Sequence, residues 1–271
     1  MQQQGQGYPI LCLHGHPGSA DCMRVFTEPL SKKFWTIAPD LRGYGRSKTR
    51  SPFTMGDHLS DLEALLDRLQ IDRCFILGWS LGGILALELA LRQPERIAGL
   101  ILVATSARPV SDLPQPSLAE LGLTLLAGSL NWINPGWPWN IETFGKRSLL
   151  KYLISQHTAE AYRFLAEAGS AAVLQTSSHA HQALNAALSQ RYDRRASLAT
   201  LTQPCLILSG ANDRHILSQS SQETAQTLPN SNYICYPGVA HLFPWEIPTA
   251  VNRDIQEWLQ TISGYPNFSQ G

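Results

Sequence analysis

A serine, an aspartate and a histidine follow one another along this chain in an order that could support nucleophilic catalysis. Ser80 stands in a Gly-Trp-Ser-Leu-Gly pentapeptide at positions 78–82, and Asp213 and His241 come after it. A serine hydroxyl is a weak nucleophile and attacks an acyl carbon only when a base takes its proton. We predict that His241 is this base and that Asp213 holds its imidazole in the required tautomer.

The residues on either side of Ser80 predict a sharp turn from a strand into a helix. The apolar run Cys74–Leu77 precedes the pentapeptide, and the apolar segment Leu81–Arg92 follows it. In this setting the Gly-x-Ser-x-Gly pattern is typical of a nucleophile elbow, in which glycines leave room for a strained serine. The alternative is that Ser80 only caps the helix that follows.

Asp213 and His241 each lie in a turn after a short apolar run. Asp213 follows Cys205–Leu208, and His241 follows Tyr233–Tyr236. In an open α/β sheet, ligands bind beyond the carboxyl ends of the strands, so both side chains are expected near Ser80.

Other acids and histidines could take these roles. Asp112 lies too far along its loop, and Asp254 is expected on the solvated face of a helix. Four other histidines downstream of Ser80 are expected to line a lid, form the pocket wall or face water: His157, His179, His181 and His215.

Acyl transfer also needs donors for the oxyanion of the tetrahedral intermediate. We expect one to be the backbone N–H of Leu81, directly after the nucleophile. The other should come from the loop His14–Gly18, where Pro17 has no N–H, so the backbone of His16 is the expected donor. His14 is expected to bond to nearby backbone and to have a structural role.

Short apolar runs alternate with helical patterns, which favours an α/β fold with a mostly parallel central sheet flanked by helices. The expected strands are Ile10–Leu13, Trp35–Ala38, Cys74–Leu77, Leu100–Val103, Cys205–Leu208 and Tyr233–Tyr236. Residues 108–200 lack a strand pattern and are expected to form a helical cap. Residues 1–107 and 201–271 would then form the core.

Four tryptophans are candidates for an apolar substrate pocket. Trp79 neighbours the nucleophile, and Trp132, Trp137 and Trp139 cluster in the expected cap. The alternative is that they pack the cap onto the sheet. Few charges are placed where they would bind a charged substrate.

The composition excludes several classes of protein. The chain has 271 residues, with 21 Lys plus Arg and 21 Asp plus Glu, so it lacks the basic excess of a nucleic-acid-binding module. No apolar run is long enough to span a membrane, and the start of the chain has no signal-peptide pattern. The five cysteines show no metal-binding spacing, so we expect reduced, buried thiols in a cytoplasmic protein without a metal. A monomer and a homodimer both remain open.

Taken together, these motifs resemble those of the α/β-hydrolase fold superfamily. The resemblance is carried by His14–Gly18, by Pro39–Ser47, by the elbow and by the turns of Asp213 and His241. It implies a cofactor-free serine hydrolase with a helical cap inserted after the sixth family strand, and a scaffold role for Arg42. The elbow is similar to those of cytosolic carboxylesterases, including the pimeloyl-carrier-protein methyl esterases.

The chain departs from the family at its start. Members usually have two antiparallel strands before the His-Gly-x-Pro-Gly loop, whereas residues 1–7 are polar here and about nine residues precede the first expected strand. We therefore expect these two strands to be missing and the strand Trp35–Ala38 to lie at an exposed sheet edge.

The sequence thus predicts hydrolysis of an ester-like bond in a small, largely apolar substrate through an acyl-enzyme. Activity should fall when His241 gains a proton at low pH. A serine at the elbow argues against haloalkane dehalogenases and epoxide hydrolases, which use an aspartate nucleophile. Peptidase, lactonase, perhydrolase, carbon–carbon bond hydrolase and acyltransferase activities remain open, as does a non-catalytic ligand-binding role.

Overall fold

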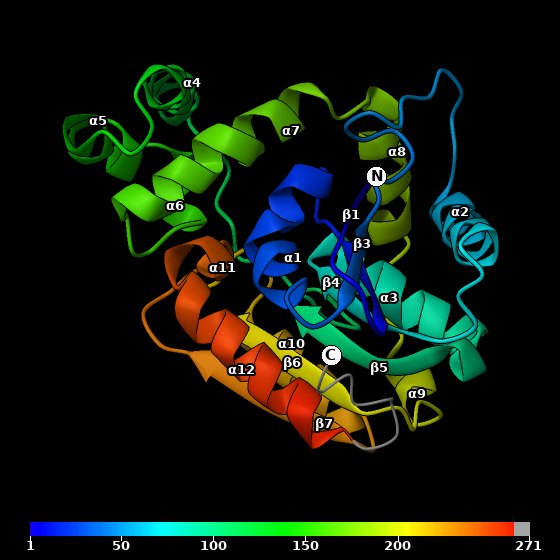
Figure 1. Cartoon of the computed structure of the whole chain (residues 1–271). Coiled ribbons are helices and arrows are strands. Elements are labelled where there is room, and N and C mark those ends of the chain that lie inside the picture. Colours follow the sequence, from blue (N-terminus) through cyan, green and yellow to red (C-terminus); the bar gives the residue numbers. More distant parts are fainter. Residues whose placement is uncertain (263–271) are drawn as a thin grey trace.

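A seven-stranded sheet with helices on both faces forms the centre of the molecule (Figure 1). The structure is a computed structural model, and it describes residues 1–262. The strands are β1 (Gln2–Gln4), β2 (Pro9–Leu13), β3 (Trp35–Ala38), β4 (Cys74–Trp79), β5 (Ile97–Val103), β6 (Cys205–Gly210) and β7 (Ser231–Tyr236). Their order is β1-β3-β2-β4-β5-β6-β7. All neighbours are parallel except β1 and β3, so the predicted α/β architecture is confirmed.

The central strands are apolar throughout because helices cover both of their faces. Every residue of β4, β5 and β6 is buried. One face packs on α1 (Arg24–Leu30) and α12 (Pro248–Thr261), and the other on α2 (Met55–Arg68), α3 (Leu81–Arg92) and α10 (Ser218–Thr227). The short α11 (Phe243–Glu246) leads into α12.

The prediction that β3 lies at an exposed edge of the sheet is wrong. β1 pairs with β3 in antiparallel register, with Gln2 opposite Ala38 and Gln4 opposite Thr36. One short strand therefore precedes β2, where sequence analysis expected none. The three glutamines gave no apolar signal. An antiparallel edge strand needs only backbone hydrogen bonds to its neighbour, so its side chains can be polar and face water.

Between β5 and β6 the described chain consists of helices and turns. The helices are α4 (Leu118–Ile133), α5 (Pro138–Thr143), α6 (Ala159–Phe164), α7 (Ser170–Leu174), α8 (Ser178–Ser189) and α9 (Arg195–Leu198). A π-helical turn (Leu165–Gly169) joins α6 to α7, and short 3₁₀ turns occur at Ala20–Met23, Pro94–Arg96, Gly145–Arg147 and Leu149–Tyr152. Helices α4 to α7 lie together at one side of the sheet (Figure 1).

This helical segment has contacts of two kinds. Ala161, Ala168 and Ala172 join the apolar cluster on the α1 and α12 face, and Ala180 of α8 joins the cluster on the other face. A separate small cluster around Tyr162 lies within the segment itself. The segment thus packs on both faces of the sheet through small side chains and through larger ones such as Phe164 and Leu198.

One of the expected buried thiols is exposed. Cys12, Cys22, Cys74 and Cys205 are free and buried, whereas Cys235 is free and exposed. Cys235 lies on β7, the last strand of the sheet, where alternate side chains face outward. Within residues 1–262, no helix is long and apolar enough to cross a membrane, and no cluster of His, Cys, Asp and Glu is placed to hold a metal ion.

Candidate active site

Ser80 lies at a strained turn between β4 and α3. Its backbone has φ 54° and ψ −114°, in a region that side chains other than glycine rarely adopt. Two contacts hold this geometry: the N–H of Ser80 donates to the carbonyl of Val103 at 2.8 Å, and the Thr105 hydroxyl donates to the carbonyl of Ser80 at 2.8 Å. The backbone is fixed by its neighbours, and Ser80 Oγ faces a cavity.

The glycines of the elbow are required by close backbone approach. A Cβ at Gly78 would lie 2.6 Å from the Cα of Gly83, and one at Gly82 would overlap the carbonyl oxygen of Leu13. Any side chain here would push α3 away from β4 or β2. The spacing of glycines around Ser80 is therefore a packing requirement of the turn.

Asp213 and His241 meet in the turns that follow β6 and β7. His241 Nδ1 and Asp213 Oδ2 are 2.7 Å apart. Asp213 Oδ1 accepts the backbone N–H groups of His215 at 2.8 Å and Ile216 at 2.9 Å, so both oxygens of this buried carboxylate are bonded. With a neutral ring that donates from Nδ1, Nε2 is left as the base.

The three predicted residues are all nearly buried, with exposed fractions of 6 % for Ser80, 2 % for Asp213 and 5 % for His241. Within residues 1–262, the imidazole of His241 bonds to Asp213, and no hydrogen bond joins this imidazole to Ser80 Oγ. Catalytic contacts of this kind often tighten only when substrate is bound.

The two expected oxyanion donors lie on either side of Ser80. Leu81 is the first residue of α3, where a helix leaves its N–H groups without intrahelical acceptors. The loop after β2 also touches the serine, because a Cβ at Gly15 would lie 3.2 Å from Ser80 Cβ. Within the described chain, the backbone N–H of His16 is bonded to no other backbone group.

The imidazole of His16 joins this loop to the helical segment. Its Nδ1 is 2.7 Å from the hydroxyl of Tyr44, and its Nε2 is 2.9 Å from Nδ1 of His181 on α8. Burial, followed by the nearby His181 and His14, lowers the pKa of His16 to about 4, so the ring is neutral at pH 7. Sequence analysis placed His181 in a lid or in water and missed this contact, which joins residues far apart in the chain.

A cavity of about 560 Å³ opens over Ser80. Its wall is formed by His16, Ser80, Leu81, Ile84, Arg108, Pro109, Ser111, Leu184, Leu188, Arg191, Tyr192, Asp193, His215 and Ile216. The wall is apolar near α3 and α8, but it also holds two arginines and one aspartate. The sequence indicated few charges placed to bind a charged substrate, whereas this wall includes three charged residues.

None of the four tryptophans belongs to this wall. Trp79 packs in the core at centroid distances of 5.9 Å from Phe26 and 5.2 Å from Trp245. Trp137 and Trp139 contact each other at 4.9 Å, and Trp132 is 73 % exposed at the end of α4. The pocket role expected for these four residues is not supported, because Trp79 packs in the core and the other three lie outside the lining of this cavity.

Glu246 is a site neighbour that sequence analysis missed. Its Oε1 accepts the N–H of Ala240 at 2.9 Å, and its Oε2 accepts those of Ser155 at 2.9 Å and Gln156 at 2.5 Å. Burial raises the pKa of this carboxyl above its usual value. Glu246 therefore fixes the residue before His241 and ties that turn to the helical segment. No local pattern signals this role.

The remaining candidates have other partners. His14 bonds to the carbonyl of Gly15 and accepts the N–H of Leu41, as expected for a structural histidine. His215 stands 4.6 Å from His241 between ring centroids, and burial lowers its pKa to about 4. Asp112 pairs with Arg214, Asp254 accepts from Tyr236, His157 bonds to Tyr162, His179 bonds to Gln182, and Arg42 pairs with Asp61.

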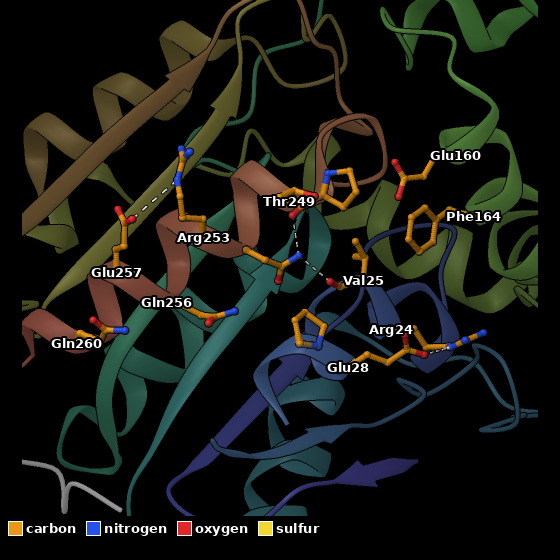
Figure 2. A pocket seen from close by; sticks show the side chains of 13 residues that line it. Arg24, Val25, Glu28, Glu160, Phe164, Thr249, Arg253, Gln256, Glu257 and Gln260 are labelled. Carbon is orange, nitrogen blue, oxygen red and sulfur yellow. Dashed lines mark hydrogen bonds and ion pairs between the residues drawn. The ribbon is translucent and has the colours of Figure 1, made fainter. Parts of the chain in front are cut away.

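A second hollow of about 600 Å³ lies between α1, α6 and α12 (Figure 2). The three residues Ser80, Asp213 and His241 are absent from its lining. Arg24 pairs there with Glu28, and Arg253 with Glu257 (Figure 2). Glu160 also lines the hollow, which therefore carries more acidic than basic side chains. The cavity that Ser80 lines is therefore the candidate active site.

Residues 8–248 match the family model described as the alpha/beta hydrolase fold. The chain belongs to this family. It is 29 % identical over 235 residues to a pimeloyl-[acyl-carrier protein] methyl ester esterase of Edwardsiella ictaluri, covering 86 % of this chain and 85 % of that one. A protein of the same name from Nitrosomonas europaea is 27 % identical over 263 residues, covering 89 % and 91 %.

Solved structures agree with this assignment. A thermophilic esterase from Thermogutta terrifontis superposes with a TM-score of 0.71 at 27 % identity, covering 97 % of this chain and 93 % of that one. The hydrolase family and an esterase-type activity are thereby supported by both sequence and fold.

Proposed function

We propose that the protein is a serine carboxylesterase that acts through Ser80, His241 and Asp213. The 2.7 Å contact between His241 and Asp213, in two turns beside a strained serine, carries this proposal. An oriented histidine and a serine at an open cavity are the two parts that acyl transfer requires.

In the proposed reaction, Ser80 Oγ attacks the ester carbonyl while His241 Nε2 takes its proton. The carbonyl oxygen becomes an oxyanion, which the N–H groups of Leu81 and His16 stabilise. His241 then protonates the leaving alcohol, and the acyl group remains on Ser80. A water that gives its proton to His241 attacks this ester, and the acid is released as Ser80 regains its proton.

The helical segment between β5 and β6 is proposed as the cap, with the boundaries 108 and 200 predicted from the sequence. Leu184, Leu188 and Arg191 bring α8 and the turn after it to the cavity wall. Substrate choice would therefore depend on α8 and on the loop after β5. The two bacterial relatives are named for a methyl ester, so methyl esters of medium-chain acids belong among the substrates to test.

The direct test is a burst experiment with p-nitrophenyl acetate and butyrate. The wild type should release one equivalent of nitrophenol per protein before steady turnover, and Ser80→Ala should show neither phase. Ser111→Ala is the matched control, because Ser111 lines the same cavity and donates to the carbonyl of Arg214. A fluorophosphonate probe should label Ser80 in the wild type. A folded protein with no burst and no labelling would favour the ligand-binding alternative.

A further inference from the structure

One cation in the wall of the catalytic cavity has no acidic partner among the described residues. Arg191 follows α8 and lines the cavity, and no ion pair or side-chain hydrogen bond is recorded for it. Arg108, on the same wall, donates from Nη2 to Glu223 at 2.8 Å. The Nε of Arg108 is buried and has no hydrogen-bond partner. Arg191 is exposed, so its guanidinium donors are available at the cavity, whereas the Nε of Arg108 is covered by protein atoms.

The nearby carboxylates are already neutralised. Arg195 donates to Asp193 at 2.7 Å through Nη2 and also lies 3.5 Å from Glu223. Arg108, Arg191 and Arg195 therefore stand against the two anions Asp193 and Glu223, which leaves the charge of Arg191 uncompensated. His215 adds no charge at pH 7, since burial holds its pKa at about 4.

The backbone at Arg191 gives a second, independent observation. Its φ is +55°, in the left-handed region, two residues after the end of α8. Glycine is favoured at this position after a helix, because a Cβ is strained there. An arginine here gives up stability that a glycine would supply, and its side chain reaches the cavity.

We propose that the Arg191 end of the cavity binds an anionic group on the ester substrate, a carboxylate or a phosphate. The guanidinium of Arg191 matches either group through paired N–H donors. This inference rests on the proposed esterase function and narrows its substrate class. The substrate is an ester whose chain is apolar near Ser80 and ends in an anion.

The test compares two esters of equal length, p-nitrophenyl hexanoate and the mono-p-nitrophenyl ester of adipic acid, whose chains end in a methyl and a carboxylate. Arg191→Gly and Arg191→Gln should lower the adipate-to-hexanoate ratio of kcat/KM roughly tenfold. The loss should appear in KM, because the contact is remote from the reacting carbonyl. Arg163→Gln is the matched control, as Arg163 is exposed on α6 and does not line the cavity.

Arg191→Gly also separates recognition from folding. Its melting temperature should equal or exceed that of the wild type, because glycine relieves the positive φ. Inhibition of adipate-ester hydrolysis by acetate and by inorganic phosphate identifies the preferred anion, and both inhibitions should weaken in Arg191→Gly. An adipate-to-hexanoate ratio that is the same in wild type and both Arg191 variants overturns the inference.

Binding measurements keep this inference distinct from the proposed function. Adipate is titrated calorimetrically into Ser80→Ala, with and without Arg191→Gly. Binding that depends on Arg191 supports the anion site even if the wild type hydrolyses neither ester, which would overturn only the esterase proposal. If Ser80 hydrolyses the hexanoate ester and adipate binds equally well with and without Arg191→Gly, only the anion site is overturned.

Discussion

The turns around Ser80 and the helices between β5 and β6 differ in how completely their side chains are bonded and packed. Around the serine, Asp213 has both oxygens bonded and the elbow glycines are in backbone contact. In the helical segment, large apolar side chains such as Leu118, Leu125 and Trp132 are exposed. Chemistry at fixed positions needs a rigid, fully bonded surround. In the proposed enzyme, the helical segment would instead supply residues that contact the substrate, such as Arg191.

The largest expected effect is a loss of kcat when Asp213, at the site around Ser80, is substituted. Asp213→Asn should reduce kcat by roughly 10⁴-fold, because the amide favours the wrong tautomer of His241. Asp254→Asn is the control on α12 and should retain activity, since Asp254 bonds to Tyr236 and Arg253. Steady-state kinetics with p-nitrophenyl butyrate measures both. Near wild-type activity in Asp213→Asn would remove Asp213 from the proposed triad.

Two glycine substitutions compare the packing of the two regions directly. Gly82→Ala should destabilise the protein by about 3 kcal/mol or more, because its Cβ would overlap the carbonyl of Leu13. Gly122→Ala on α4 should stabilise it by about 0.5 to 1 kcal/mol, because no atom lies within 4 Å of the added Cβ. Urea unfolding gives both free energies. Equal effects at the two sites would contradict the contrast.

The pH dependence of stability should come mainly from histidines packed near the sheet. Burial lowers the pKa of His14, His58 and His215 to about 4, from 6.5 in the unfolded chain. Between these values the unfolded state binds more protons, so the free energy of unfolding falls as pH drops from 6.5 toward 4. Each histidine contributes up to about 1.4 kcal/mol per pH unit in this window.

Variants of single histidines assign this slope. His58→Gln should reduce the loss of stability between pH 6.5 and 4.5, since His58 is buried with an unpaired Nδ1. His179→Gln should change the slope less than His58→Gln does, because His179 is only partly buried on α8. Chemical unfolding at several pH values measures both. An unchanged slope in His58→Gln would assign the pH dependence to other groups.

The smallest effect is expected on the exposed end of α4. Trp132→Gln should change the free energy of unfolding by less than about 0.5 kcal/mol and leave p-nitrophenyl butyrate hydrolysis unchanged. Trp79→Phe is the contrasting variant, because Trp79 packs on Phe26 and Trp245 in the core. A strong activity loss in Trp132→Gln would restore the pocket role expected from the sequence.

Local pattern was a reliable guide wherever a residue's role depends on its immediate neighbours. The six apolar runs became strands, and the spacing of glycines around Ser80 became the strained turn between β4 and α3. Strand periodicity and turn chemistry act over a few residues, so they can be read along the chain. Chain order also placed Asp213 and His241, because the turns after parallel strands share one edge of the sheet.

Tertiary structure alone decided the contacts between distant segments. The amino-terminal glutamines cover β3, His16 meets His181, Glu246 bonds to Ser155, and Arg108 and Arg191 reach one cavity. The same holds for the tryptophans, whose apolar character predicts burial but not its place. These pairings depend on how distant segments pack across the sheet, and residues far apart in the chain carry no local signal of each other. The sequence by itself therefore determined the fold and the turn at Ser80, whereas packing decided which charged residues line the cavity.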